Sequence, residues 1–406
     1  MTPKQQNILR VFLGSLVGMA LIFELIRDSQ RDGDFIGYIN AGNAVLNGSP
    51  IYADYLNTWP PFFAIFSVPL AWIDAISPLF IRLVWLIGII ISWFYISRYV
   101  VRLTSNNKVV LFKSDMPTDV WLLDWRVFLP LLFILRFILD DLSNIQINTF
   151  LLLACLFVID CHFKRRHIAG GIVLGLIIAL KVYPLFLLLF LFYKRSWKMA
   201  VTTIIVLAGS VGMSLLVFGW DVGIANYVDW ISNKVMGATI ITHKNQSLFP
   251  WFEGLLTDQS RGLDIFYNIS SLSSATAKKV PYVVVGVVAL FVGWRFRNSD
   301  TREQSVGQFF FILAAIPILS PLAWKYYFVF LFPILFLQFN RLFIIDAKQG
   351  LSKGLFIAAL VLSIASTDGL LGTRVSDVLE IYGCVTWATA CLLLSYIVTD
   401  KPLSKL

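Results

Sequence analysis

Long apolar runs dominate this chain of 406 residues and restrict what it can fold into. Many of these runs are about 17–22 residues long, which is the length that a helix needs to cross a bilayer. The strands of a membrane barrel alternate apolar and polar residues, whereas these runs are continuous. Only 14% of the residues are charged, against about 25% in soluble domains. The sequence therefore predicts an all-α polytopic membrane protein.

About twelve membrane helices are expected in total. Two of them form a hairpin at residues 168–193, because this run has basic residues at both ends and Pro184 near its middle. The run is long enough for two short helices only, with Lys181 near the apex. The other spans are expected at residues 8–26, 77–97, 121–139, 147–160, 199–219, 278–296, 307–320, 324–340, 354–371 and 381–398.

The positive charges predict how the chain is oriented. Most Lys and Arg residues, Lys113 among them, lie on one side of the spans, so this side and both termini are expected to be cytoplasmic. The net charge of +9 is thus explained without a nucleic-acid partner. Residues 27–76 and 220–277 are expected on the extracytoplasmic face, where the short run at residues 60–73 lies half-buried. Residues 1–406 are expected to form one integral domain of the plasma membrane, with the first span retained rather than cleaved.

An acidic turn opens the first extracytoplasmic segment. Apolar residues recur at helical spacing from Phe35 to Leu46, which predicts an amphipathic helix in the membrane interface. Asp34 directly precedes this pattern. Two interpretations of Asp34 are open: its carboxylate caps the helix, or it acts as an exposed general base. Asp32 is an alternative base, or a solvated charge of the loop.

Polar residues gather in two later segments of the expected outer face. The neighbouring carboxylates Asp140 and Asp141 belong to a solvated loop or, alternatively, bind a divalent cation. The second segment has hydrogen-bonding groups that suit a phosphate or a sugar, although it also fits an ordinary turn. It contains His243, Lys244, Asn245 and Gln246.

Two lysines lie inside or at the edge of apolar segments. Lys325 opens the expected span at residues 324–340 beside Trp324 and Tyr326, and Lys181 lies in the hairpin. Each side chain can simply extend toward the water–lipid boundary. Ionisable groups at this depth are nevertheless functional candidates, and an ammonium group suits a lipid-linked phosphate.

Several common chemistries are excluded by motifs that the sequence lacks. It has no HExxH, GxSxG, P-loop or dinucleotide-binding motif. The 3 histidines are too scattered for a metal cluster, and the 4 cysteines show no paired spacing that would indicate disulfides or a zinc site.

The order of the polar motifs resembles that of glycosyltransferase family 87, whose members are multispanning enzymes of the GT-C class. This chain has Asp34 with Tyr38 four residues later, and then TWPPF, NIQIN, ALKVYP, NQSL and SPLAWKYYF. The resemblance extends over about residues 8–340, and it depends on the order of these motifs rather than on any one of them.

The resemblance implies a GT-C-type fold with juxtamembrane helices on the outer face, where a sugar is transferred. The family includes enzymes that take mannose from a polyprenyl phosphate and add it to phosphatidylinositol mannosides. It implies a polyprenyl-phosphate sugar as donor, a lipid or glycan as acceptor, contact with membrane lipids, and an inverting reaction. The general base of the family falls on Asp34. Because the leaving group has no diphosphate to chelate, no metal or other cofactor is required in principle.

One position departs from the family pattern. Many members carry a histidine shortly after the SPxxW motif, where this chain has Lys325 followed by Tyr326. We therefore assign the phosphate contact to Lys325 because of its charge, and we take mannose as the default sugar. Two other functions remain open. One is a transporter or flippase of lipid-linked sugars, although no inverted repeat is found, and the other is a scaffold in envelope assembly.

Overall fold

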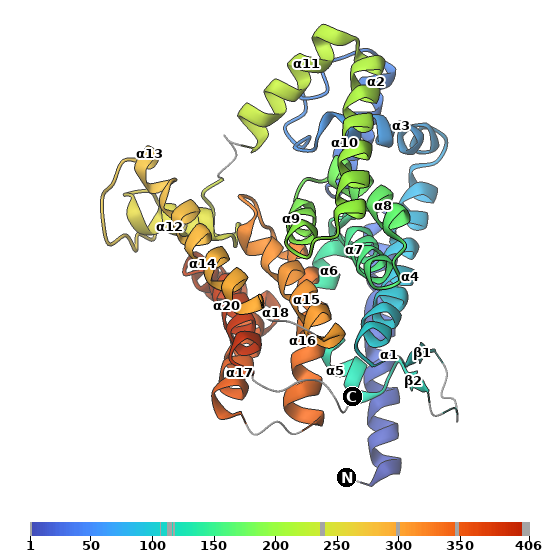
Figure 1. Cartoon of the computed structure of the whole chain (residues 1–406), viewed down its shortest axis with the longest axis vertical. Helices are drawn as coiled ribbons and strands as arrows, with labels where there is room; N and C mark the ends of the chain where they lie inside the picture. Colours follow the sequence, from blue (N-terminus) through green and yellow to red (C-terminus); the bar gives the residue numbers. More distant parts are fainter. Residues whose placement is uncertain are drawn as a thin grey trace. The chain divides into compact units, whose positions relative to one another are not determined.

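The computed structural model describes residues 2–105, 107–111, 116, 118–235, 240–297, 301–345 and 349–399. Lys113 and the C-terminal residues 400–406, which entered the predicted orientation, lie outside the described residues. The described chain is almost entirely helical (Figure 1). It divides into two compact units, unit 1 of residues 1–129 and 138–237, and unit 2 of residues 130–137 and 238–406.

Unit 1 contains the first helices of the chain and one pair of short parallel strands, β1 (Lys108–Val110) and β2 (Asp119–Trp121). The helix α8 packs against α7 and α10, and α2 packs against α3. The helices of unit 1 are α1 (Pro3–Asp28), α2 (Phe35–Leu46), α3 (Pro61–Ile76), α4 (Pro78–Ser105), α7 (Asn148–Phe163), α8 (His167–Leu180), α9 (Leu185–Tyr193), α10 (Trp197–Phe218), α11 (Trp220–Asp229) and the π-helix η1 (Trp230–Val235). The two units share α5 (Trp125–Phe133) and α6 (Leu135–Ser143).

Unit 2 is built around α15 and α20, which pack against each other, and α17 packs against α20 (Figure 1). A 3-10 helix, η2 (Lys325–Leu331), leads directly into α16. The other elements are α12 (Leu248–Leu256), α13 (Ser274–Ala277), α14 (Val280–Phe296), α15 (Arg302–Leu319), α16 (Phe332–Phe339), the π-helix η3 (Asn340–Ile344), α17 (Gly350–Ala365), α18 (Asp368–Leu371), α19 (Thr373–Ile381) and α20 (Cys384–Ile397).

Within the described residues, 5 helical segments are long and apolar enough to cross a membrane. The bent pair of α19 and α20, with an angle of 59° between them, adds a sixth if it is counted as one span. The all-helical membrane architecture predicted from the sequence is therefore confirmed, but the expected count of about twelve membrane helices is not. The 5 segments are Lys4–Asp28, Pro78–Ser105, Trp197–Phe218, Ser274–Phe296 and Lys325–Ile344.

Two expectations about individual segments have different outcomes. The run at residues 168–193 does form two short helices, with Lys181 and Pro184 in the break between them. The single span expected at residues 121–139 is wrong. The N–H of Ile134 donates to Leu131 O, three residues back instead of four, and the helix is interrupted there between α5 and α6.

Close backbone contact between α2 and α3 positions the start of α2. A Cβ atom added at Gly42 of α2 would lie 2.5 Å from the backbone oxygen of Ser67 in α3. Because that neighbour is backbone, it cannot move aside by a change of rotamer. Gly42 is therefore required for the contact between the two helices.

We predict that Gly42→Ala lowers the melting temperature of the purified protein in detergent. The added methyl group overpacks the α2–α3 contact, which typically costs about 1–3 kcal/mol. Gly209→Ala on α10 is the matched control, because a Cβ there meets nothing within 4 Å. Equal melting temperatures for the two variants would contradict the assigned role of Gly42.

Candidate functional site

Six of the predicted site residues, Asp34, Tyr38, Lys181, His243, Lys244 and Lys325, belong to two polar clusters, one in each unit. The cluster in unit 1 is named the Asp34 network, and the cluster in unit 2 is named the Glu380 cluster. The Asp34 network consists of Asp34, Tyr38, Asp141, Gln146, Asn148, Lys181 and Tyr183. The Glu380 cluster consists of Arg136, His243, Lys244, Lys325, Asp368, Asp377 and Glu380.

Asp34 is the residue before α2, as the sequence predicted, but its side chain does not cap that helix. Its carboxylate Oδ2 instead accepts a hydrogen bond of 2.5 Å from Nε2 of Gln146. The capping interpretation is therefore wrong, because the backbone at Asp34 is helical rather than extended, with φ −76° and ψ −7°. The carboxylate belongs to a side-chain network and not to its own helix.

Two residues with left-handed backbone bring Asp34 and Gln146 together. Gly33 has φ +51°, and a Cβ there would lie 3.1 Å from the backbone of Asn144. The N–H of Asp34 donates to Asn144 O at 3.2 Å. Ile145, which is fully buried, has φ +48° directly before Gln146. A β-branched residue in this region is strained, and such strain persists where the surrounding structure holds it.

Tyr38 anchors α2 from inside unit 1. Its ring makes edge contacts with Trp59 and Phe63, at centroid distances of 4.7 Å and 5.0 Å. Phe35 packs against Trp85 on α4, and Phe35 and Tyr38 are fully buried. Phe35 and Tyr38 therefore pack against protein, whereas Leu46 at the other end of α2 is exposed.

Lys181 is buried and is held by two side-chain amide oxygens. Its Nζ donates to Oδ1 of Asn148 at 3.0 Å and to Oε1 of Gln146 at 3.4 Å. The hydroxyl of Tyr183 donates to the same Asn148 oxygen at 2.6 Å. Both amides belong to the NIQIN motif, and Lys181 and Tyr183 belong to the ALKVYP motif, so the two motifs bind each other.

Asp141 joins the Asp34 network through Asn148. Its side chain is fully buried and accepts hydrogen bonds from Nδ2 of Asn148 at 3.0 Å and from Oγ1 of Thr149 at 2.6 Å. The interpretation of Asp141 as a solvated loop charge is therefore wrong. Asp32, by contrast, is exposed and pairs with Arg82 at 2.7 Å.

In unit 2, cations converge on the fully buried carboxylate of Glu380. Nζ of Lys325 lies 2.5 Å from Oε1, and Nζ of Lys244 lies 3.5 Å from Oε2. Lys244 also pairs with Asp377, and Lys325 lies 3.9 Å from Asp368. Burial opposes the charge of Lys244, but the nearby carboxylates of Asp377 and Glu380 raise its pKa above the ordinary value. The structure thus brings together two lysines that the sequence had singled out separately.

Arg136 is the third cation of this cluster. Its Nη2 lies 3.8 Å from Oε1 of Glu380, and its Nη1 donates to Oγ of Ser366 at 2.7 Å. Sequence reasoning missed both Arg136 and Glu380. The signal for Arg136 was present, because an arginine inside an expected span is a functional candidate by the rule applied to Lys181.

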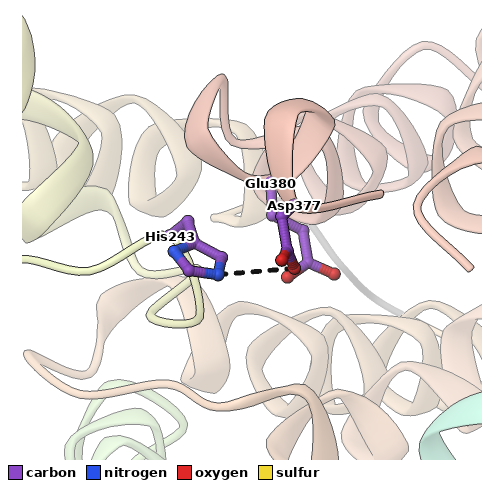
Figure 2. A group of neighbouring side chains, drawn as sticks. All are labelled: His243, Asp377 and Glu380. Carbon is purple, nitrogen blue, oxygen red and sulfur yellow. Dashed lines mark ion pairs between the residues drawn. The ribbon is translucent and has the colours of Figure 1, made fainter. Parts of the chain in front are cut away.

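His243, Asp377 and Glu380 also offer atoms that could ligate a metal ion (Figure 2). Their ligand atoms lie within 4.8 Å of one another, and Nε2 of His243 lies 3.4 Å from Oδ1 of Asp377. The same carboxylates already bind Lys244 and Lys325. A metal ion would have to displace these ammonium groups from the carboxylates.

The remaining candidate residues lie next to the Glu380 cluster. Asn245 and Gln246 are fully buried, and their side-chain amides donate to Pro321 O at 3.2 Å and to Glu380 O at 2.8 Å. These bonds tie the NQSL segment to the SPLAW segment and to α19. The substrate contact expected for these two residues stays a prediction. Next to Lys325, Trp324 is half-buried, and the ring of Tyr326 stacks on the ring of Tyr327.

Comparison of the chain with known proteins identifies its family. A model of glycosyltransferase family 87 matches residues 57–323 of the chain. The chain is also 24% identical over 319 residues to the polyprenol-phosphate-mannose-dependent α-(1-2)-phosphatidylinositol mannoside mannosyltransferase of Mycolicibacterium smegmatis. That alignment covers 73% of this chain and 67% of the relative.

The apolar helices and these similarities define an integral membrane glycosyltransferase of the hexosyltransferase class. The chain belongs to glycosyltransferase family 87, because the family match spans more than half of it. Asp34 and Lys325 lie outside the matched residues 57–323. The roles of these two residues therefore depend on the geometry and on the motif order, and they are treated below as proposals.

We predict that Glu380→Gln destabilises the protein by about 3 kcal/mol or more, because removal of one partner of a buried ionic cluster leaves the others uncompensated. The measurement is thermal unfolding in detergent. Asp264→Asn in the same unit is the control, since Asp264 is exposed. An unchanged melting temperature for Glu380→Gln would show that the cations do not depend on this carboxylate.

Proposed function

We propose that this protein transfers a hexose, mannose by default, from a polyprenyl phosphate to a lipid or glycan acceptor on the extracytoplasmic face of the plasma membrane. Both termini are then cytoplasmic. The relative from M. smegmatis is named for its dependence on polyprenol-phosphate-mannose, which supports this class of donor. The proposal depends most on Asp34, whose carboxylate is held by Gln146 rather than by the N–H groups of its helix.

Asp34 is the general base of the proposed reaction. It removes the proton from the acceptor hydroxyl as the oxygen attacks the anomeric carbon. The bond from that carbon to the phosphate oxygen breaks, and polyprenyl phosphate leaves from the opposite face, so the configuration inverts. A base within hydrogen-bond reach contributes about 10²–10⁴-fold to such a rate.

The departing phosphate is held by Lys325, with Lys244 and His243 beside it. Fixed positive charge stabilises the negative charge that develops on a leaving group. Lys325 and Lys244 bind carboxylates, and each ammonium group has further N–H donors that the phosphate can accept from. Trp324 and Tyr326 contribute the apolar surface next to Lys325. The reaction needs no metal in principle, because the leaving group has no diphosphate to chelate.

We predict that Asp34→Asn lowers kcat by about 10²-fold or more with an intact fold, since the amide cannot accept the proton. Transfer from polyprenyl-phosphate mannose to a phosphatidylinositol mannoside acceptor is followed by mass spectrometry. Asp32→Asn is the control and keeps its activity, because Asp32 is exposed and bound to Arg82. Full activity of Asp34→Asn would refute the base role. Movement of the donor lipid across the membrane without a glycosidic product would instead indicate a flippase.

We predict that Lys325→Met raises the KM for the polyprenyl-phosphate donor about tenfold, because one phosphate contact is lost. Lys278→Met is a matched control in the same unit, since Lys278 also lies near a buried glutamate, 3.9 Å from Glu253. The measurement is the dependence of initial rate on donor concentration. Equal donor KM values for the two variants would remove Lys325 from the phosphate site.

A further inference from the structure

Three motifs of the sequence meet at Gln146, and each contributes a pair of polar residues. Asp34 and Tyr38 come from the start of α2, and Lys181 and Tyr183 from the break between α8 and α9. Gln146 lies in the turn before α7, and Asn148 is the first residue of α7. Gln146 lies between the other residues. Its Nε2 donates to Asp34 at 2.5 Å, while its Oε1 accepts from the hydroxyl of Tyr38 at 2.9 Å and from Nζ of Lys181 at 3.4 Å.

The charge of Lys181 determines which way the Gln146 amide points. An ammonium group can only donate hydrogen bonds, so the amide oxygen of Gln146 must face Lys181. The amide N–H₂ group must then face Asp34. Reversal of the amide would set two donors against each other at Lys181 and two acceptors against each other at Asp34. Because Gln146 is almost fully buried, water would not relieve either conflict.

The surrounding structure also keeps Lys181 and the Gln146 backbone in place. Asn148 accepts from Lys181 and Tyr183 through Oδ1 and donates to Asp141 through Nδ2, so its amide orientation is fixed too. The indole N–H of Trp85 donates to the backbone oxygen of Gln146 at 3.2 Å. The strained backbone of Ile145 directly precedes Gln146. A high-energy backbone conformation next to a buried side chain is typical of functional sites.

We propose that Gln146 and Lys181 are a pair of positioning residues that hold the carboxylate of Asp34 in one orientation. This inference rests on the proposed function of Asp34 as the base. A misplacement of about 1 Å in a catalytic group can cost about 10²-fold in rate, so a fixed hydrogen-bond donor at this carboxylate matters. Lys181 acts through Gln146 and does not contact the phosphate of the donor, unlike the role expected for it from the sequence.

Several charged and titratable groups of unit 1 lie around the carboxylate of Asp34. Lys181 and Tyr183 approach from the break between α8 and α9, Tyr38 from α2 and Asp141 from α6. Asp32, two residues before Asp34, is paired with Arg82. Loss of Gln146 removes the donor that holds Oδ2 of Asp34 in place.

The test compares Gln146→Met, Gln146→Glu and Lys181→Met with the wild-type protein in the mannose-transfer assay. We expect Gln146→Met to lower kcat about ten- to hundredfold at unchanged donor KM. Gln146→Glu keeps an acceptor for Lys181 but faces Asp34 with a second carboxylate, so its loss of kcat is larger. Gln308→Met, which removes another buried glutamine, is the control and keeps its kcat.

Lys181→Met should also lower kcat at unchanged donor KM. The double variant Gln146→Met/Lys181→Met should be no slower than the slower single variant, since both changes break one connected network. A raised donor KM at unchanged kcat in Lys181→Met would instead assign Lys181 to the phosphate. Wild-type kcat in all variants, while Asp34→Asn is inactive, would overturn the positioning role alone. Absence of sugar transfer by the wild-type protein would overturn the proposed function itself.

Discussion

Polar groups inside this apolar protein have to be paired with one another. An amide or a charge in a helical membrane protein has little water to bind, and an unpaired buried group costs several kcal/mol. Gln146 satisfies this requirement in unit 1, because its two amide ends connect Asp34 with Lys181. Glu380 satisfies it in unit 2, because its carboxylate balances Lys325, Lys244 and Arg136. The two clusters have different chemistry: the first holds a carboxylate through an amide, and the second pairs cations directly with carboxylates.

The start of α2 illustrates how packing gives a common residue a particular role. An aspartate before a helix usually caps it, and Asp34 has the right position for a cap. Its environment differs because Tyr38 is locked between Trp59 and Phe63, and Gly42 lets α2 approach α3 closely. The helix is thus fixed against unit 1, and Asp34 is turned toward Gln146. Phe35 and Tyr38 of this apolar pattern pack against protein and hold this orientation.

The sequence predicted the helices better than it predicted the contacts between them. The break at Lys181 and the helix at Phe35–Leu46 follow from local signals, namely a proline within an apolar run and helical periodicity. The interruption at Ile134 has no such local signal, because the sequence has no proline or glycine there. The expected count of spans is not confirmed, and length in the sequence does not report where helices break or how much of a helix is buried in protein.

Residue types and motif order in the sequence were sufficient to identify a membrane protein, to single out Asp34, Lys181 and Lys325, and to indicate the family. They could not identify the partners of these residues. Gln146 is 112 positions from Asp34 in the sequence, and Glu380 lies far along the chain from Lys325. Side chains so distant in sequence meet only when helices pack, and the hydrogen-bonding direction of an amide is decided by the group it meets. The tertiary structure alone therefore determined that Asp34 is held by Gln146 and that the cations of unit 2 converge on Glu380.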